Sequence, residues 1–538
     1  MIRQFLVVGI SLPYQEPQES ICDAACRRVH KILPHAVIVH AGLYKQSLDC
    51  RRQDRICHVC TVHVSLECNE KEATRLTTLD PHIRPLQTDP MQISYGTHPL
   101  RGRVAVIGFG PCGMFAALVL AEHGYIPIIF ERGDDIEDRI ATVQAFRETH
   151  RLDPCSNVQF GAGGAGTFSD GKLTTRINDA KCRFVLERLV SFGADPSILI
   201  QAKPHLGTDV LPGIVARIRD HLRAQGAEFY FRTTVQSFVP MPDGSLTLQT
   251  GKGSFSCGAA ILAPGHSARD LYRTLLYQGY ALEPKPFSVG VRIEHLQADI
   301  NAAVYGKAAS DPLLPPAEYA LSYRSGERGV YSFCMCPGGE VVGAASEAGG
   351  VVVNGMSNSR RDGKNANAAL AVSVLPADFS GDCLQAIAFQ QNLEHAAFIA
   401  GGEDYACPIQ TVGDYLTGRQ GSEPKRVQPT YMAGHTKLAQ LRAILPSFIN
   451  EMLQIGIIRF GKQYKGFDAA DAVLSAVETR TSAPVRILRT DAGNAIGQPL
   501  IFPAGEGAGY AGGITSAACD GVGAALRVMA HFAPPQAL

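Results

Sequence analysis

The chain contains no tryptophan and carries no excess charge of either sign. Fifty Lys and Arg residues balance fifty Asp and Glu residues over 538 positions. No overall field therefore attracts the protein to nucleic acid or to an anionic membrane. We expect no nucleic-acid partner, and any other partner has to be argued from local features.

The sequence also lacks a long apolar run. A membrane-spanning helix needs roughly 18 uninterrupted apolar residues, and the N-terminal run before Ser11 has only six, without a small-residue cleavage pattern. The fifteen cysteines are odd in number and scattered, unlike the dense framework of a small secreted domain. These absences predict no membrane span, no signal peptide, and a cytoplasmic location with reduced thiols.

The first 95 residues predict a small α+β module that ends in a linker. Periodicity predicts strands at 2–10, 36–43 and 57–66 and a helix at 18–32. Residues 81–102 carry Pro, Gly and polar residues without clear periodicity, which is typical of a linker.

A glycine motif follows this boundary. The pattern predicts a strand, a helix and a second strand at 103–108, 112–123 and 126–131. Gly108, Gly110 and Gly113 satisfy the G-x-G-x-x-G spacing where the first strand turns into the helix. The first glycine permits the sharp turn, the second lets a pyrophosphate approach the backbone, and the third lets the helix pack closely. This context favours a dinucleotide site over a merely structural turn.

Glu131 ends the second predicted strand, where a carboxylate accepts hydrogen bonds from an adenosine ribose. Its negative charge argues against a 2′-phosphate at that place. The segment alone leaves both NAD and FAD open.

Two later segments extend the pattern. Residues 228–265 predict a strand, a three-stranded meander with a Pro-Asp-Gly turn, and an apolar strand ending in Pro-Gly. Residues 499–529 predict a strand, a Gly-rich turn that contains Glu506, and an Ala-rich helix.

With these segments in place, the chain resembles FAD-dependent oxidoreductases with two dinucleotide-binding domains, and most closely the bacterial family described as uncharacterised FAD-dependent dehydrogenases. The resemblance covers nearly the whole chain. It rests on FGAGGAGTFSDGKL (160–173), FCMCPGGEVVGAASE (333–347), NGMSNSRRDGKNANAALAVSV (354–374), ETRTSAPVRI (478–487) and PAGEGAGYAGGI (503–514).

The resemblance implies an α/β fold whose Rossmann-like FAD-binding domain is discontinuous, at 101–284 and 484–538. An inserted α+β substrate region at 285–483 and the N-terminal α+β module at 1–95 complete the expected architecture. The residues implied to bind FAD are Gly108, Gly110, Pro111, Gly113, Glu131, Arg132, Gly163, Gly164, Val235, Ala263, Gly265, Gly505, Glu506, Gly512, Gly513 and Ile514.

Three of these assignments have a physical reason or an open alternative. A Gly-rich turn that opens a helix near Gly512 can aim N–H groups at the flavin N1 and C2 carbonyl. Glu506 departs from the Asp usual in the superfamily, which puts its ribityl contact in doubt. The loop that holds Gly163 and Gly164 either lets the backbone approach the flavin or is a surface loop, and its Lys172 is either a cation for substrate or ring or a solvated side chain.

Cysteines and arginines outside these motifs have both structural and functional interpretations. Alternation along a strand would put the sulfurs of Cys334 and Cys336 on one face, as a strained disulfide, an electron relay or ordinary buried thiols. The pairs Cys57 with Cys60 and Cys22 with Cys26 do not predict a metal site, because zinc needs four converging ligands. Arg292, His295, Arg480 and Arg486 are candidates to grip a substrate carboxylate, but structural ion pairs, for instance of Glu478 with a nearby Arg, are the default.

We therefore expect a cytoplasmic FAD-dependent oxidoreductase, or dehydrogenase, in which a hydride passes between flavin N5 and a small-molecule substrate, NAD(P)H or an electron-transfer partner. No catalytic acid or base is identified. The alternatives are a non-redox flavoprotein with structural or sensory FAD and a macromolecular partner, and an NAD-binding dehydrogenase without flavin.

Overall fold

The computed structural model describes residues 1–87, 91–175, 177 and 179–534. The chain forms two compact units. The first comprises residues 1–91, 178–205 and 301–317, and the second comprises 92–177, 206–300 and 318–538.

The first unit is built on an antiparallel sheet of order β2-β3-β1-β4, which is the split β-α-β arrangement. Its elements are β1 (Ile2–Pro13), α1 (Gln18–His30), β2 (Val37–Asp49), β3 (Cys57–Glu67), α2 (Glu70–Leu79) and β4 (Ile83–Pro85). Phe5 and Val7 of β1 and Val29 of α1 are buried in its core. The expected α+β module is confirmed. Strand β4, however, lies in the predicted linker and pairs with β1.

Two later elements, α5 (Ala180–Ser191) and the 3₁₀ turn Pro196–Leu199, also belong to the first unit. The amide of Gln46 on β2 donates to the carbonyl of Ile200 at 2.8 Å. A segment remote in sequence is thereby joined to the edge strand of the sheet.

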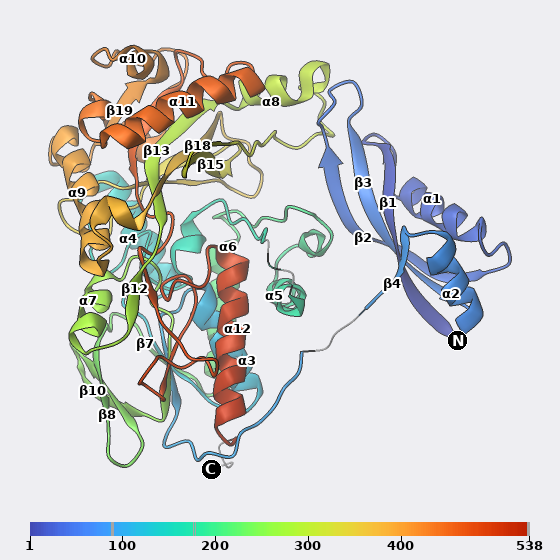
Figure 1. Cartoon of the computed structure of the whole chain (residues 1–538), viewed down its shortest axis with the longest axis horizontal. Helices are drawn as coiled ribbons and strands as arrows, with labels where there is room; N and C mark the ends of the chain where they lie inside the picture. The colour runs from blue at the N-terminus through green and yellow to red at the C-terminus, as the bar shows by residue number, and fades with distance from the viewer. Residues whose placement is uncertain (88–90, 176, 178, 535–538) are drawn as a thin grey trace. The chain divides into compact units, whose positions relative to one another are not determined.

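The second unit contains a parallel five-stranded sheet of order β23-β11-β5-β6-β7, made of β5 (Val104–Ile107), β6 (Ile128–Phe130), β7 (Glu228–Tyr230), β11 (Ala259–Leu262) and β23 (Ile501–Pro503). Helices α3 (Pro111–Glu122) and α12 (Ile514–His531) pack side by side against it (Figure 1). Strand β5, helix α3 and strand β6 confirm the predicted start of a dinucleotide-binding fold. The Ala- and Leu-rich α3 is buried along nearly its whole length, which fits its lack of a polar face.

The predicted meander is also present, as β8 (Val235–Pro240), β9 (Leu246–Thr250) and β10 (Gly253–Cys257).

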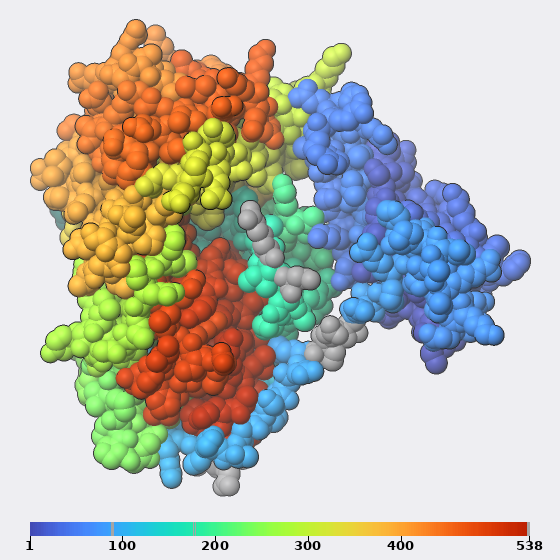
Figure 2. All heavy atoms as spheres, in the orientation of Figure 1, coloured from blue at the N-terminus to red at the C-terminus, as the bar shows by residue number. Residues whose placement is uncertain are grey.

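Near the C-terminus, the segment around Gly96 runs along the end of α12. The Gly96 amide donates to the Met529 carbonyl at 2.7 Å, and Figure 2 shows the two segments at the surface of the same face. The first and last segments of the second unit are thus joined by a backbone hydrogen bond.

The chain between the two parts of the parallel fold in sequence forms a seven-stranded sheet of order β14-β15-β18-β13-β21-β19-β20. Its strands are β13 (Phe287–Leu296), β14 (Ser322–Ser325), β15 (Arg328–Cys336), β18 (Asn365–Val374), β19 (Cys407–Thr411), β20 (Thr436–Leu438) and β21 (Val473–Glu478). Helices α9 (Cys383–Gly401) and α11 (Ser447–Gln463) contact it, and β16 (Glu340–Gly343) and β17 (Val353–Met356) form a separate hairpin. The fold is therefore the expected discontinuous Rossmann-like domain with an inserted α+β region.

Candidate cofactor site

The G-x-G-x-x-G turn between β5 and α3 has the geometry its spacing predicts. Gly108 has a φ of +97°, and a Cβ there would collide with the carbonyl of Ala263. A Cβ at Gly113 would collide with the carbonyl of Gly108, so only glycine lets α3 approach the strand this closely. A Cβ at Gly110, by contrast, would meet only the Gly164 backbone at 3.5 Å or more.

Helices α3 and α12 both begin without a side-chain cap. The residues at their N-caps are Gly110 and Gly513, and neither offers an oxygen to the free amides of the first turn. Two helix ends with partial positive charge are therefore left to be satisfied by an anion or another acceptor.

The backbone around these ends faces open space. A Cβ built on Gly265, Gly512 or Gly513 has no neighbouring atom within 4 Å among the described residues. This is a cradle of exposed amides and glycines, and it fits a long ligand that carries a diphosphate and a hydrogen-bonding ring.

Three glycine-rich segments meet at this cradle. The Gly163 amide donates to the Phe109 carbonyl at 2.8 Å, and the backbone of Gly164 lies against Gly110. A Cβ at Gly166 would lie 2.8 Å from the Ile514 side chain at the start of α12. The loop with Gly163 and Gly164 therefore contacts both helix ends, so the surface-loop alternative is wrong.

Glu131 ties the same segments together. Its carboxylate accepts hydrogen bonds from the amides of Phe109 at 2.8 Å, Gly133 at 2.9 Å and Gly161 at 3.0 Å. An ionised carboxylate has about four lone-pair positions, so one remains for a ribose hydroxyl. Its neighbour Arg132 pairs with Asp270 at 2.7 Å and stacks over the Phe160 ring.

Arg139 on α4 (Ile136–Thr149) organises the loop that holds Gly163 and Gly164, which we call the glycine loop. This role was not predicted from the sequence. Its buried guanidinium donates to the carbonyls of Asn157, Val158, Gly161, Ala162 and Gly164 at 2.7 to 3.2 Å. Burial lowers the Arg139 pKa to about 10, which still leaves it charged at neutral pH. The available signal was a charged residue in the apolar stripe that Ile136 and Phe146 share.

The turn after β23 is fixed by a second missed residue, Asp520. Its carboxylate accepts from the Gly505 amide at 2.7 Å and pairs with the Arg489 guanidinium at 3.0 Å. A Cβ at Gly505 would lie 2.8 Å from the Cβ of Cys112 on α3. The C-terminal turn and the first glycine motif are therefore in contact.

Within the described part of the chain, the Glu506 carboxyl group has no hydrogen-bond donor that would stabilise its ionised form. Burial raises the Glu506 pKa to about 7, and the nearby Lys285 cation offsets this only in part. A carboxyl group that is half-protonated near neutral pH can accept or donate a hydrogen bond to a polyol.

Two further predicted contacts, Ala263 and Val235, lie at the end of one strand and at the start of another. Ala263 follows β11, and its amide donates to the Ile107 carbonyl at 2.8 Å. Val235 begins β8 and packs in the apolar core that includes Ile107 and Phe130.

Lys172 is neither a solvated side chain nor a free cation. Its ammonium pairs with the buried Asp170 at 2.8 Å, and Arg361 pairs with the same carboxylate. Burial would raise the Asp170 pKa, but Lys172 and Arg361 together hold it below its usual value. The cluster is an ion-pair network that joins the glycine loop to residue 361.

The expected alternation of Cys334 and Cys336 is wrong. The ladder between β15 and β18 shifts register between Phe333 and Cys336, and Cys334 has a φ of +42°. A bulge breaks the period-two pattern. Both cysteines are thiols outside any disulfide, and burial raises their pKa values.

The arginine candidates make ion pairs, as the default interpretation predicted. Arg292 lies 3.5 Å from Glu478, Arg486 lies 3.0 Å from Glu283, and Arg480 binds Glu394 together with Arg269. The ring nitrogen of His295 lies 2.8 Å from the Phe467 carbonyl.

Burial, with Arg480 and Arg269 nearby, lowers the pKa of His266 to about 3, so this imidazole beside Gly265 is neutral.

The described residues contain no cluster of three or more His, Cys, Asp or Glu side chains arranged to hold a metal ion. Among the helices in the same part of the chain, none combines the length and apolarity needed to cross a membrane.

Comparison with known proteins identifies the family. A protein of Clostridium beijerinckii described as "Uncharacterized protein" is 44% identical over 506 residues, covering 93% of this chain and 94% of the relative. The chain belongs to the same family. The model of a family described as "FAD-dependent protein, C-terminal domain-like" also matches residues 286–481, the region of the seven-stranded sheet. FAD is the cofactor, as the sequence predicted.

Solved structures show weaker similarity. The complex of CtdE with FAD is 10% identical, covers 82% of this chain and 87% of that chain, and has a TM-score of 0.32. The flavin-dependent halogenase CmlS is 13% identical over 81% and 60% of the two chains, with a TM-score of 0.33. At these scores neither activity transfers to the family.

Proposed function

We propose that the chain is an FAD-dependent oxidoreductase that works as a dehydrogenase. The observation that carries the proposal is the meeting of two uncapped helix ends, Gly110 at α3 and Gly513 at α12, in one glycine-lined cradle. A dinucleotide needs an anion site and a polar ring site a fixed span apart, and two such ends supply both.

The residues of the first glycine motif would hold the adenosine diphosphate half of FAD. The free amides at the start of α3 would bind the pyrophosphate, and the remaining acceptor position of Glu131 would receive a ribose hydroxyl. Arg132, Val235, Ala263 and Gly265 would line the same path. Arg139 acts through the loop that it fixes, as a positioning residue.

The C-terminal turn would hold the flavin half. Gly505 and Glu506 would lie beside the ribityl chain, while the amides of Gly513 and Ile514, which open α12, would donate to the ring edge that becomes negative on reduction. The Gly512 amide donates to the Ser516 hydroxyl at 3.1 Å, so Gly512 would contribute open space beside the ring and not a donor. Gly163 and Gly164 would let the backbone approach closely. Bound FAD supplies a two-electron acceptor, and these residues supply orientation and charge stabilisation.

A small molecule would serve as the hydride donor, either a metabolite or NAD(P)H. The sequence carries one complete glycine fingerprint in a strand-to-helix context, so a nicotinamide would visit the flavin without a dedicated Rossmann domain. The odd number of scattered cysteines fits a reducing, cytoplasmic compartment.

Anaerobic titration of the purified yellow protein tests this function. NADH, NADPH and a panel of metabolites are added singly while the absorbance of oxidised flavin is followed. We expect at least one donor to bleach the flavin stoichiometrically and air to restore the colour. Unchanged absorbance with every donor, in a protein that chemical reductants do bleach, would contradict the dehydrogenase function.

A further inference from the structure

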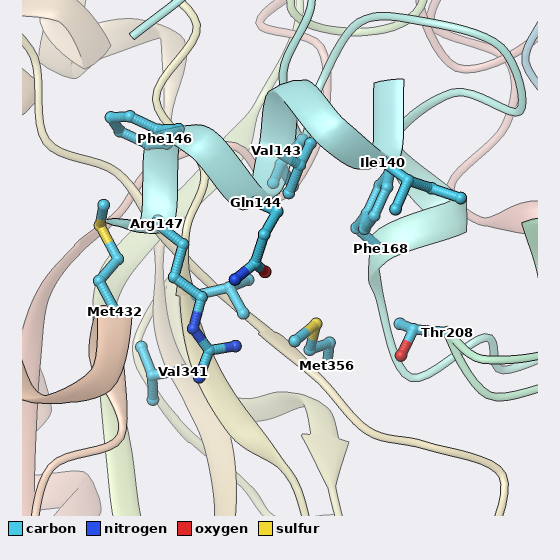
Figure 3. Close-up of a pocket in the computed structure, with 13 residues that line it drawn as sticks. Ile140, Val143, Gln144, Phe146, Arg147, Phe168, Thr208, Val341, Met356 and Met432 are labelled. Atoms are coloured by element: carbon cyan, nitrogen blue, oxygen red, sulfur yellow. The ribbon is translucent and has the colours of Figure 1, made fainter. Parts of the chain in front are cut away.

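A cavity of about 160 Å³ lies between helix α4 and the β16–β17 hairpin. Figure 3 shows Val143 on α4 and Phe168 from the glycine loop on one side, and Val341, Met356 and Met432 opposite. The cavity is therefore formed where the Rossmann-like part meets the hairpin of the inserted region.

The floor of the cavity is apolar and buried. Val341, Val158 and Met432 are 1%, 3% and 5% exposed, yet they border empty space. A dry apolar cavity of roughly 150 Å³ is large enough to bind benzene. The space here matches one aromatic ring.

One side of the cavity is polar. The side chains of Gln144 and Arg147 extend from α4 towards the opposite wall (Figure 3). The Gln144 amide group donates to Glu148 at 2.6 Å, and one Arg147 nitrogen lies 2.9 Å from a Glu340 oxygen. A guanidinium has five N–H donors, so a single contact with Glu340 leaves others for a second carboxylate.

We propose that this cavity binds a one-ring aromatic carboxylate, with its ring between the two methionines and Phe168 and its carboxylate on Arg147. Methionine side chains are flexible and polarisable, and their sulfurs make favourable contacts with aromatic rings. Arginine recognises carboxylates through paired N–H donors. The inference goes beyond the proposed function, because it concerns a binding site and not the molecule that the flavin oxidises.

Isothermal titration calorimetry of the full-length protein with benzoate and with benzyl alcohol tests the site. We expect saturable one-to-one binding of benzoate. Arg147→Gln should weaken benzoate by about tenfold or more and leave benzyl alcohol unchanged. Val143→Phe fills the cavity and should abolish the binding of both. Arg151→Gln, which removes an exposed arginine just after α4, is the matched control and should bind like the wild type.

The absence of saturable benzoate binding up to about 10 mM would overturn the proposal, as would unchanged affinity in Val143→Phe. Equal weakening of both ligands by Arg147→Gln would overturn the carboxylate contact. Met356→Phe narrows the cavity from the opposite wall and provides the same test if Val143→Phe does not fold. Calorimetry does not depend on flavin, so benzoate binding to a protein without redox activity would contradict only the proposed function.

Discussion

The backbone of Gly505 packs directly against the side chain of Cys112. A methyl group at position 505 would lie 2.8 Å from the Cys112 Cβ. Since Cys112 is in the first turn of α3, this contact brings the turn after β23 to the glycine motif that follows β5. The proposed cofactor site depends on this approach between segments that are remote in sequence.

Gly505→Val should therefore destroy FAD retention. Gly505 has a φ of +77°, which a β-branched residue avoids, and the added atoms would push the turn away from α3. We expect the ratio of flavin to protein absorbance after purification to fall at least about tenfold, a loss on the order of 1.4 kcal/mol or more of binding energy.

Gly244→Val is the matched control. Gly244 has a similar φ of +83° but lies in the turn before β9, with open space around its Cβ. It should cost about 1–3 kcal/mol of stability through backbone strain while the protein stays yellow. Equal flavin loss in both variants would show that general destabilisation, and not the site, is responsible.

Arg139→Met should disorganise the glycine loop. The substitution keeps an apolar side chain but removes the guanidinium donor from the carbonyls of Asn157, Val158 and Ala162. We expect a loss of about 3 kcal/mol or more in the free energy of unfolding and weaker FAD binding, measured by urea denaturation and flavin release. Arg151→Met replaces an exposed arginine just after α4 and should leave both quantities unchanged. A fully loaded, stable Arg139→Met protein would contradict the positioning role.

Glu394→Gln should destabilise the protein severely. Glu394 accepts hydrogen bonds from Arg269 and Arg480 at 2.7 to 3.0 Å in a fully buried site. Burial alone would raise its pKa, but the two guanidinium groups lower it to about 2. Removing this charge leaves two buried guanidinium groups with only Glu347 as a counter-charge, at a cost of about 3–5 kcal/mol. Thermal unfolding measures the effect, with the exposed Glu451→Gln as a neutral control.

Glu506 should make the stability of the flavin-free protein fall as pH rises. Its folded pKa of about 7 exceeds the ordinary 4.5, so the folded state holds a proton that the unfolded state releases. The stabilisation is complete below about pH 4.5 and is lost as pH passes 7, by at most about 3 kcal/mol. Glu506→Gln should flatten this dependence. Parallel curves of melting temperature against pH for the two proteins would contradict it.

The start of the parallel fold was predictable because its signals are local. Gly108 and Gly113 are required by the turn itself, and the flanking apolar periodicity defines β5, α3 and β6 without reference to the rest of the chain. Strand β4 was missed because its three residues are too few to show a period.

The supports of the site were not predictable, because their partners lie elsewhere in the sequence. Arg139 binds carbonyls of a later loop, and Asp520 holds the amide of Gly505 from within α12. The bulge at Cys334 depends on the register with β18, which the sequence of β15 alone does not contain. Local patterns thus predicted the glycines of the turns, while tertiary contacts determine which residues support them.

The stoichiometry of FAD in purified Gly110→Val tests the central claim most directly. Gly110 has an extended conformation that valine adopts, and among the described residues a Cβ built there would meet the backbone of Gly164 alone, at 3.5 Å or more. We predict that the variant folds and, in the absence of flavin, has the melting profile of the wild type. It should purify without yellow colour, because the new side chain would occupy the space proposed for the pyrophosphate. A folded Gly110→Val protein that carries one FAD per chain would contradict the account.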